Sequence, residues 1–198
     1  MSFFNDAFDK FEIILGSKSP RRSQLLTDLG IRFKIVLKEF DESFPVHLKR
    51  EQVALHLALK KAEALSDELR NANTLIITAD TIVCIGDLLI GKPIDYDDAV
   101  SILKKLSGKM HEVFTGVCIS AVDKKELFFV RSEVYFKILG DNEIHFYLKN
   151  YKPFDKAGAY GVQDWIGLTG IEKINGSFHN IMGLPVKEVY EHLIRFAQ

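Results

Sequence analysis

The sequence predicts an α/β fold, and two observations support that prediction. In the first half of the chain, short apolar runs typical of strands alternate with stretches that have a helical apolar face. In the second half, two long strand-like runs flank a short charged turn. The chain has 198 residues, of which 47% are hydrophobic, enough to bury one substantial core. We therefore expect a single domain over residues 1–198, either undivided or as two closely fused lobes.

The first predicted unit is a strand followed by a helix. Residues 11–15 form an apolar run typical of a buried strand. Ser19 suits the N-cap of the helix, and Pro20 suits its first position because the nitrogen there needs no partner. An apolar leucine face follows and ends at Gly30.

The turn between this strand and helix has the composition of a phosphate site. Its free backbone N–H groups are joined by the hydroxyls of Ser17 and Ser19. The guanidinium groups of Arg21 and Arg22 converge on the same helix N-terminus. Taken alone, the segment also fits a capped surface helix with solvated arginines. A P-loop is excluded, because the first glycine of that pattern is missing and position 11 is Phe.

The rest of the first half continues the alternation of strand and helix. Apolar periodicity marks each element. The helix that ends at Gly108 has acidic residues before it and basic residues at its end, an order that matches the helix dipole. The further elements expected are strands over 33–37, 75–79, 81–85 and 88–90, a helix over about 50–69, and a helix that follows Asp98 and ends at Gly108.

The second half is richer in strand. Residues 111–122 and 127–139 predict a long antiparallel hairpin. Asp141 is expected to cap a short helix, and a final helix follows Pro185. Between them, residues 151–185 have an irregular pattern with six glycines. So long an irregular region favours a functional role, and the alternative is a glycine-rich hairpin that closes the sheet.

Overall charge and cysteine usage exclude several classes of protein. Twenty-six Lys and Arg against 27 Asp and Glu give a formal net charge of −1, so no broad basic surface is expected to attract nucleic acid. No run is long enough for a transmembrane helix, and the start of the chain, with Asn5 and Asp6, lacks the basic region of a secretion signal. We expect a cytoplasmic protein that binds no membrane. Cys84 and Cys118 lie in apolar runs without the spacing of a zinc site and are expected to be buried.

Three acidic residues are candidates for catalysis. Asp80 follows the strand over 75–79, and ligands of open α/β sheets bind beyond the carboxyl ends of strands. Asp41 and Glu42 lie in a polar loop after another strand and are expected at the same edge. Carboxylates gathered near a triphosphate bind Mg²⁺ or Mn²⁺ and lower the pKa of a bound water. The alternative is that Asp80 is only a turn residue.

Two lysines are candidates for neutralising phosphate. Lys61 lies in the long predicted helix, where the neighbouring Lys60 is an alternative. Lys92 stands between Gly91 and Pro93, two residues that fix the loop presenting it. Solvated surface lysines are the alternative for both.

Later polar residues are candidates for lining the same cleft. His111, Thr115 and Gly116 begin the long hairpin, with a purely structural histidine as the alternative. Gln163 and Asn180 lie in the glycine-rich region, where a buried amide can read the edge of a base by paired hydrogen bonds.

Five blocks of sequence are more informative together than apart. They are residues 17–22 (SKSPRR), 78–81 (TADT), 91–93 (GKP), 107–117 (SGKMHEVFTGV), and 156–163 (KAGAYGVQ) continuing to 176–185 (GSFHNIMGLP). In this order, over nearly the whole chain, they resemble the Maf family of nucleoside triphosphate pyrophosphatases.

The resemblance implies a Maf and inosine-triphosphatase-like fold, in which helices flank a long curved mixed sheet and two lobes surround a cleft. It implies hydrolysis of a nucleoside triphosphate to the monophosphate and pyrophosphate, with Mg²⁺ or Mn²⁺, and a role in cleaning the nucleotide pool. It also implies a homodimer. The alternative is a non-catalytic nucleotide-binding regulator of cell division and septum formation, which has no need of Asp80.

The resemblance also assigns roles to residues. Asp80 falls at the family's general-base position, and Glu42 matches an acidic position associated with metal, so both are expected near the ion. Arg21, Thr81 and Gln163 fall on positions associated with substrate choice and resemble the dTTP and UTP branch. The positions that match phosphate-facing residues are Ser17, Arg21, Lys61 and Lys92.

The chain departs from the family pattern in two places. Lys18 stands where a small residue is more usual, and it adds charge beside the phosphates. Asp164 and Trp165 follow Gln163, where glycine is common. These two residues suggest an altered shape for the base pocket.

Overall fold

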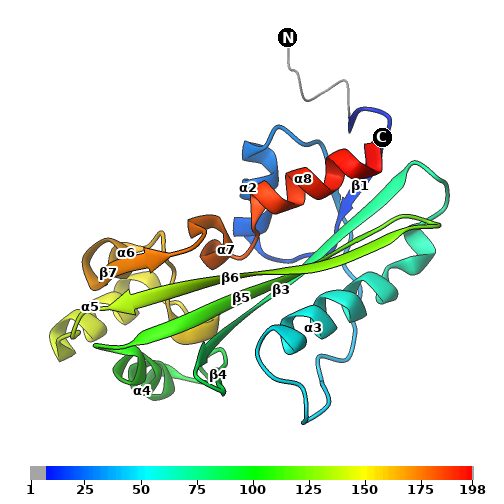
Figure 1. Ribbon diagram of the computed structural model, residues 1–198. Coiled ribbons are helices and arrows are strands. Elements are labelled where there is room, and N and C mark those ends of the chain that lie inside the picture. The colour runs from blue at the N-terminus through cyan, green and yellow to red at the C-terminus, as the bar shows by residue number, and fades with distance from the viewer. Residues whose placement is uncertain (1–7, 198) are drawn as a thin grey trace.

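The computed structural model describes residues 8–197, so the polar start with Asn5 and Asp6 lies outside it. At its centre is one mixed sheet of seven strands in the order β2-β1-β3-β5-β6-β7, with β4 paired to β3 (Figure 1). This confirms the predicted α/β fold with a mixed sheet. The strands are β1 Glu12–Leu15, β2 Lys34–Ile35, β3 Thr74–Ile85, β4 Leu88–Ile90, β5 Met110–Ser120, β6 Lys125–Phe136 and β7 Ile171–Asn175.

Parallel and antiparallel pairing meet at β3. Strand β1 runs parallel to β2 and β3, whereas β4, β5, β6 and β7 are joined to the sheet by antiparallel pairing. The pairing of β5 with β6 extends from Met110 opposite Tyr135 to Ser120 opposite Lys125, which confirms the predicted long hairpin. Strand β2 is shorter than expected and holds only two residues.

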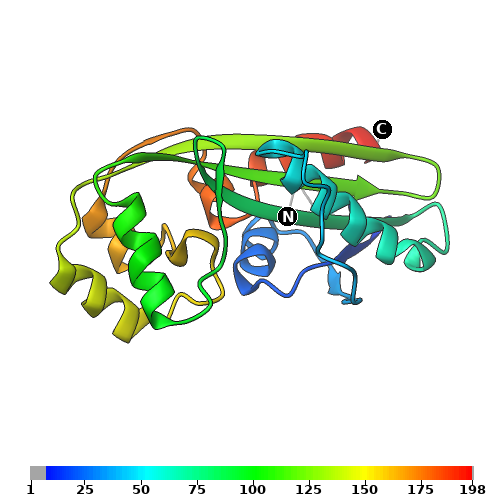
Figure 2. The same cartoon turned by 90° about the horizontal axis from the view of Figure 1, so that it is seen from below.

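Two groups of helices lie toward the two ends of the long strands, and α3 lies along the face of β3 and β5 (Figure 2). One apolar core, which includes Leu26 and Leu193, packs α2 and α8 against β1 and β3. A second core, which includes Leu103 and Ile144, joins α4, α5 and α6. These cores correspond to the two expected lobes. The helices are α2 Pro20–Asp28, α3 Glu51–Ala64, α4 Tyr96–Leu106, α5 Asp141–Tyr151, α6 Trp165–Gly170, α7 Phe178–Met182 and α8 Val186–Ala197, with 3-10 turns η1 Ser66–Glu68 and η2 Ala157–Ala159.

The sheet has a gap beside the middle of β3. Strand β1 ends after pairing with residues 74–77 of β3, and β4 pairs only with residues 83–85. Between them, residues 78–82 have no strand partner on this edge within the described part of the chain. On the other edge β5 continues past them without interruption. The gap therefore leaves the middle of a central strand open to ligands.

Residues 151–185 are more regular than the sequence suggests. They contain η2, α6, β7 and α7, and β7 pairs with β6. These elements span only three to six residues each, too few to produce a recognisable period. The prediction of a long irregular region is therefore wrong.

Asp141 is the first residue of α5 and not its cap, so that prediction is also wrong. Gly140 holds the N-cap position, and its N–H donates to Glu143 Oε2 at 2.8 Å. Asp141 instead forms an ion pair with Lys104 of α4 at 2.9 Å. An acid at the third helical position has taken the capping role.

Both cysteines are buried, as predicted. Burial raises the pKa of the Cys84 thiol to about 11, so it stays protonated at neutral pH. Over residues 8–197, no helix combines the length and the apolar character needed to cross a membrane.

Candidate active site

A cavity of about 760 Å³ lies at the gap in the sheet. It is bordered by the turn after β1, the loop over 36–44, α3, β3 and the segment over 155–163. All the residues that the family resemblance singles out line this cavity, although they come from distant parts of the chain. They are Ser17, Arg21, Glu42, Lys61, Asp80, Thr81, Lys92 and Gln163.

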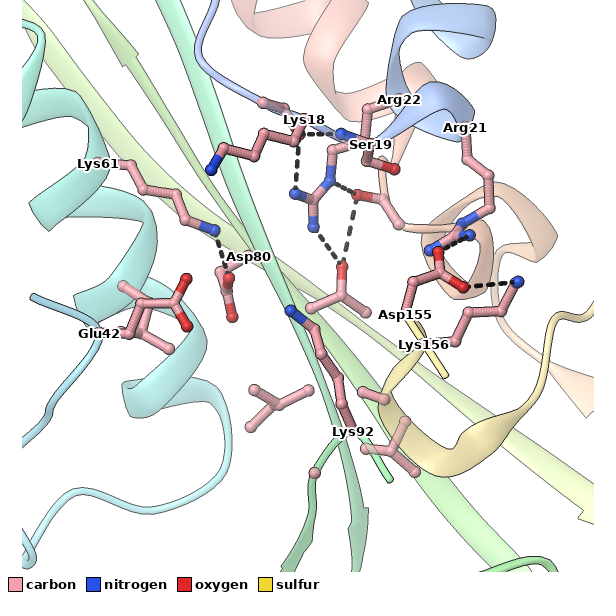
Figure 3. Close-up of a pocket in the computed structure, with 18 of the residues that line it drawn as sticks. Lys18, Ser19, Arg21, Arg22, Glu42, Lys61, Asp80, Lys92, Asp155 and Lys156 are labelled. Atoms are coloured by element: carbon pink, nitrogen blue, oxygen red, sulfur yellow. Dashed lines mark hydrogen bonds and ion pairs between the residues drawn. The ribbon is translucent and has the colours of Figure 1, made fainter. Parts of the chain in front are cut away.

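Asp80 lies in the middle of β3, not at the end of a strand as predicted, because β3 continues to Ile85. The strand that ends at this level is its parallel neighbour β1. Lys61 of α3 donates from Nζ to Asp80 Oδ1 at 2.5 Å (Figure 3). It also donates to the carbonyl oxygen of Ala79 at 3.2 Å, which gives a partner to the backbone at the open edge.

Lys61, and not Lys60, faces the cavity. Its side chain is largely buried, and its Nζ lies 5.4 Å from the centre of the Phe40 ring. Burial lowers the pKa of the Lys61 ammonium, while the charges of Asp80 and Glu42 act in the opposite direction. The ammonium group is thus held among carboxylates at the open edge of β3.

Asp41 does not line the cavity, and the prediction that it shares the site is wrong. Its carboxylate accepts hydrogen bonds from the Ser43 N–H at 2.9 Å and from Lys60 Nζ at 3.1 Å. Hydrogen bonds from Ser43 and Lys60 lower the pKa of Asp41 to about 2. Asp41 therefore stabilises the loop that carries Glu42.

Glu42 and Asp80 are two of the four carboxylates that line the cavity, with Glu39 and Asp155. The charges of Glu42 and Asp80 both act on Lys61. Within residues 8–197, His, Cys, Asp and Glu side chains form no group of three or more suited to a metal ion. Mg²⁺ commonly takes one or two carboxylates and completes its shell with water and substrate phosphates. The pair therefore fits an ion that binds together with a phosphate chain.

The turn after β1 presents polar groups to the cavity. Ser17 Oγ accepts a hydrogen bond from the Ser19 N–H at 3.2 Å. Ser19 is the N-cap residue of α2, as predicted, but its side chain makes no capping hydrogen bond to any described residue. The side chain of Lys18 is exposed, and its amino group extends into the pocket toward Lys61 (Figure 3).

Arg22, predicted with Arg21 as part of a phosphate site, is a buried anchor whose guanidinium group is bonded to the protein itself. It donates from Nε to the Gly183 carbonyl oxygen at 2.7 Å, from Nη2 to Thr81 Oγ1 at 3.0 Å and from Nη1 to Ser17 Oγ at 3.3 Å. These bonds join the turn after β1, the middle of β3 and the end of α7. One signal was present in the sequence: Arg22 precedes the first two leucines of the apolar helix face by three and four residues.

Arg21 reaches across the cavity to a segment of the other lobe. Its Nη1 lies 3.0 Å from Asp155 Oδ2, and Asp155 Oδ1 accepts a hydrogen bond from Lys156 Nζ at 2.9 Å. Both partners line the cavity. They were not predicted as site residues, because the region that contains them lacks a clear period.

Lys92 extends from the loop after β4 toward the centre of the pocket (Figure 3). The carbonyl oxygen of the preceding Gly91 accepts a hydrogen bond from the Gly158 N–H at 3.0 Å. Pro93 on the other side is buried. The loop that presents Lys92 is therefore held on both sides, as its Gly and Pro neighbours predict.

Three residues of β5 do not line the cavity, contrary to the prediction. His111 is fully buried, and its Nε2 lies 2.8 Å from the Tyr160 hydroxyl. Thr115 donates to the carbonyl oxygen of Asn180 at 2.9 Å. Gly116 lies against the backbone of α3, where an added Cβ would come within 2.5 Å of main-chain atoms. All three are packing residues of a covered strand.

Of the two predicted base-reading amides, only Gln163 lines the cavity, and it is exposed. Asn180 is fully buried and donates from Nδ2 to the Val113 carbonyl oxygen at 3.1 Å and to Ser132 Oγ at 2.9 Å. The prediction that Asn180 reads a base is therefore wrong, because its amide is used to join α7 to the sheet.

Asp164 supports the segment that carries Gln163. Its Oδ2 accepts a hydrogen bond from the Tyr147 hydroxyl at 2.7 Å, and that hydroxyl accepts one from the Gly161 N–H at 3.0 Å. The acid that replaces the usual glycine is thus held by α5 behind the cavity.

The chain is similar to one protein family and to named relatives over nearly its whole length. The profile of the Maf-like protein family matches residues 12–196. A "dTTP/UTP pyrophosphatase" of Parabacteroides distasonis is 48% identical, over 94% of this chain and 97% of its own length. Proteins with the same name from Porphyromonas gingivalis strain W83 and Phocaeicola vulgatus are each 47% identical. They cover 98% and 93% of this chain and 98% and 96% of their own lengths.

Proposed function

The chain belongs to the Maf-like protein family, and from this membership we propose that it is a nucleoside triphosphate pyrophosphatase that acts on dTTP and UTP. It hydrolyses the bond between the α- and β-phosphates and releases the nucleoside monophosphate and pyrophosphate. The observation that supports this most directly is the Asp80–Lys61 pair at the open edge of β3, inside a cavity where cationic side chains outnumber anionic ones.

In the proposed reaction Asp80 is the general base. Lys61 holds Oδ1 by a hydrogen bond and leaves Oδ2 directed into the open pocket (Figure 3). Asp80 takes a proton from a water molecule as the water oxygen forms a bond to the α-phosphorus. The bond from that phosphorus to the bridging oxygen breaks, and pyrophosphate leaves with its electron pair.

The positive side chains hold the phosphate chain and stabilise the charge that grows on it. Ser17 and the N-terminus of α2 contribute hydrogen-bond donors. The residues proposed to bind phosphate are Ser17, Arg21, Lys61 and Lys92.

We propose that Glu42 and Asp80 hold a divalent metal ion, Mg²⁺ or Mn²⁺, together with the substrate. When bound, such an ion supplies neutralising charge and polarises a phosphoryl oxygen. The positive charge of Lys61 interacts with both carboxylates and partly neutralises their negative charge before substrate binds.

Arg21, Thr81 and Gln163 are proposed to select the pyrimidine base. Gln163 is exposed at the surface of the cavity, and Arg21 is held at the same side by Asp155. The Thr81 hydroxyl contacts Arg22 and lies 2.9 Å from Thr115 Oγ1, so we expect Thr81 to act by shape rather than by a free hydroxyl.

Product analysis tests the proposal. The purified protein is incubated with each common nucleoside triphosphate and Mg²⁺ or Mn²⁺, and the products are separated by ion-exchange chromatography. Monophosphate and pyrophosphate from dTTP or UTP are expected, with at least a hundredfold loss in Asp80→Asn. Asp141→Asn, which removes a carboxylate outside the cavity, is the matched control. Release of orthophosphate contradicts the assigned bond, and binding without turnover favours the non-catalytic regulator.

We also propose that the protein acts in the cytoplasm as a homodimer and as a single Maf-like domain over residues 1–198. A net charge of −1 supports a role on small nucleotides rather than on nucleic acid. Light scattering tests the dimer, and cell fractionation tests the location.

A further inference from the structure

Lys60 of α3 bridges the two residues that flank Glu42, one of the carboxylates proposed to bind the metal ion. Its Nζ donates to Asp41 Oδ2 at 3.1 Å and to the Ser43 carbonyl oxygen at 3.1 Å. The same two residues are joined to each other, because the Ser43 N–H donates to Asp41 Oδ1 at 2.9 Å and the Ser43 hydroxyl donates to Asp41 Oδ2. Glu42 therefore lies at the centre of a small turn that one ammonium group fastens to α3.

The segment over 39–48, which carries Glu42, has few other attachments. Most of it is exposed. Among the described residues, no backbone hydrogen bond joins this segment to another part of the chain, and the side-chain hydrogen bonds that it receives from outside are the two from Lys60. Phe40 and Leu48 add apolar contacts with α3 and the sheet. A segment with so few hydrogen bonds is stable locally only where those few hold it.

The second proposed metal carboxylate is held more firmly. Asp80 lies within β3, where its backbone is paired with β5, and it accepts a hydrogen bond from Lys61 at 2.5 Å. Figure 3 shows Glu42 and Asp80 facing each other near the amino group of Lys61. A shift of the segment over 39–48 moves Glu42 and leaves Asp80 in place. The separation of the two carboxylates therefore depends on where this segment is fastened to α3.

We propose that Lys60 is a positioning residue for the metal site. By holding the turn around Glu42 against α3, it keeps this carboxylate close to Asp80, where both can contact one ion. A carboxylate that is already in place loses less conformational freedom when the ion binds, an advantage of about three- to tenfold in affinity. This inference rests on the proposed function, because it concerns the ion assigned there.

Binding of Mn²⁺ tests the inference without turnover. The signal of free Mn²⁺ in electron paramagnetic resonance gives its dissociation constant in the presence of α,β-methylene-UTP, which cannot be hydrolysed between its α- and β-phosphates. Lys60→Gln keeps part of the stem and removes the ammonium group, so it should weaken Mn²⁺ binding about three- to tenfold. Loss of a positive charge near a cation would by itself strengthen binding. The direction of the change therefore separates positioning from simple electrostatics.

Three further variants make the result specific. Lys60→Arg keeps a charged donor and should restore most of the affinity. Glu42→Gln removes the carboxylate that is positioned, so Lys60→Gln should cause no further loss of Mn²⁺ affinity in that background. Lys104→Gln is the matched control, because it removes the lysine of an ion pair with Asp141 outside the cavity, and it should leave Mn²⁺ binding unchanged.

Kinetics with dTTP or UTP add a second readout. In Lys60→Gln the Mg²⁺ concentration that gives half of the maximal rate should rise about three- to tenfold. The kcat at saturating Mg²⁺ should change by less than about threefold, because the exposed ion pair with Asp41 contacts no reacting group. A merely structural role for Lys60 instead lowers Tm and leaves the Mg²⁺ dependence unaltered.

Unchanged or tighter Mn²⁺ binding in Lys60→Gln overturns the inference, and so does a further loss in the Glu42→Gln background. Failure of the proposed function is distinguishable from both. A protein that binds Mn²⁺ with the analogue and hydrolyses no nucleotide disproves the function, and the comparison of Mn²⁺ affinities still decides the role of Lys60.

Discussion

Replacing Arg22 with Met is expected to weaken the fold and the site together. Methionine keeps much of the apolar stem but loses all three hydrogen bonds of the guanidinium group. Ser17 keeps its bond to Ser19, and Thr81 keeps its contact with Thr115. The Gly183 carbonyl is the group most affected, because it keeps only a long hydrogen bond from the Thr81 hydroxyl at 3.4 Å. A hydrogen bond from a charged donor contributes about 1.5–3 kcal/mol, and the buried carbonyl loses its short one. A net loss of about 3 kcal/mol follows.

This loss corresponds to a clear change in melting temperature. For a chain of 198 residues, each 1 kcal/mol lowers Tm by about 2–4 °C, so Arg22→Met should melt about 6–12 °C lower. Differential scanning calorimetry measures the shift. The same variant should lose kcat/KM, because Ser17 and Thr81 are no longer held at their places in the cavity.

The adjacent arginine is the matched control. Arg21 makes a partly exposed ion pair with Asp155, and such pairs contribute about 0–1 kcal/mol. Arg21→Met should therefore lower Tm by less than about 4 °C while reducing kcat/KM at least tenfold through lost contacts to substrate. Equal Tm losses in the two variants, or an unchanged Tm in Arg22→Met, would refute the reasoning that Arg22 is the anchor and Arg21 the ligand.

Three further predictions concern charge and packing. Lys61→Gln should reduce turnover at least a hundredfold and Lys60→Gln less than threefold, because only Lys61 contacts Asp80; equal losses in a pyrophosphate-release assay would contradict this. Burial lowers the pKa of His111 from 6.5 to about 4. Between these pH values the unfolded chain therefore binds more protons than the folded protein. The free energy of unfolding then falls by up to about 3 kcal/mol as the pH drops from 6.5 to 4. A plot of Tm against pH should be flatter in that range for His111→Gln, and an unaltered slope assigns the loss to other groups. Gly116→Ala should lower Tm by several degrees, because its Cβ would clash with the backbone of α3, whereas Gly91→Ala meets nothing within 4 Å and is the control.

The parts of the site that the sequence could predict are those with a local signature. The turn from Ser17 to Arg22 and the loop around Lys92 are set by proline, glycine and capping residues within a few positions of each other. The local conformation of these two segments follows from the backbone preferences of neighbouring residues, and the structure has the turn and the loop where those preferences predict them. The choice between Lys60 and Lys61 has no such signature. The two differ by about 100° around α3, and only the position of β3 decides which one meets Asp80.

The errors have a common physical cause in tertiary contacts. Asp80 interrupts an apolar run and predicts a break between strands over 75–79 and 81–85, yet β3 continues through it. Lys61 and Arg22, from two different helices, satisfy the polar side chains of Asp80 and Thr81. Asn180 was expected to face a ligand, but its amide joins α7 to the sheet. In each case the partner is more than 15 positions away, which a local pattern cannot contain.

The open middle of β3 gives two adjacent residues access to the same ligand from opposite faces of the sheet. Asp80 points toward α3 and pairs with Lys61, whereas Thr81 points toward α2 and α7 and pairs with Arg22. In a fully paired strand, two such neighbours would be separated by the sheet itself. Because β1 ends before them and β4 begins after them, both line one cavity. The proposed base and a proposed selector thus lie on adjacent residues of one backbone segment, each held by a side chain from a different helix.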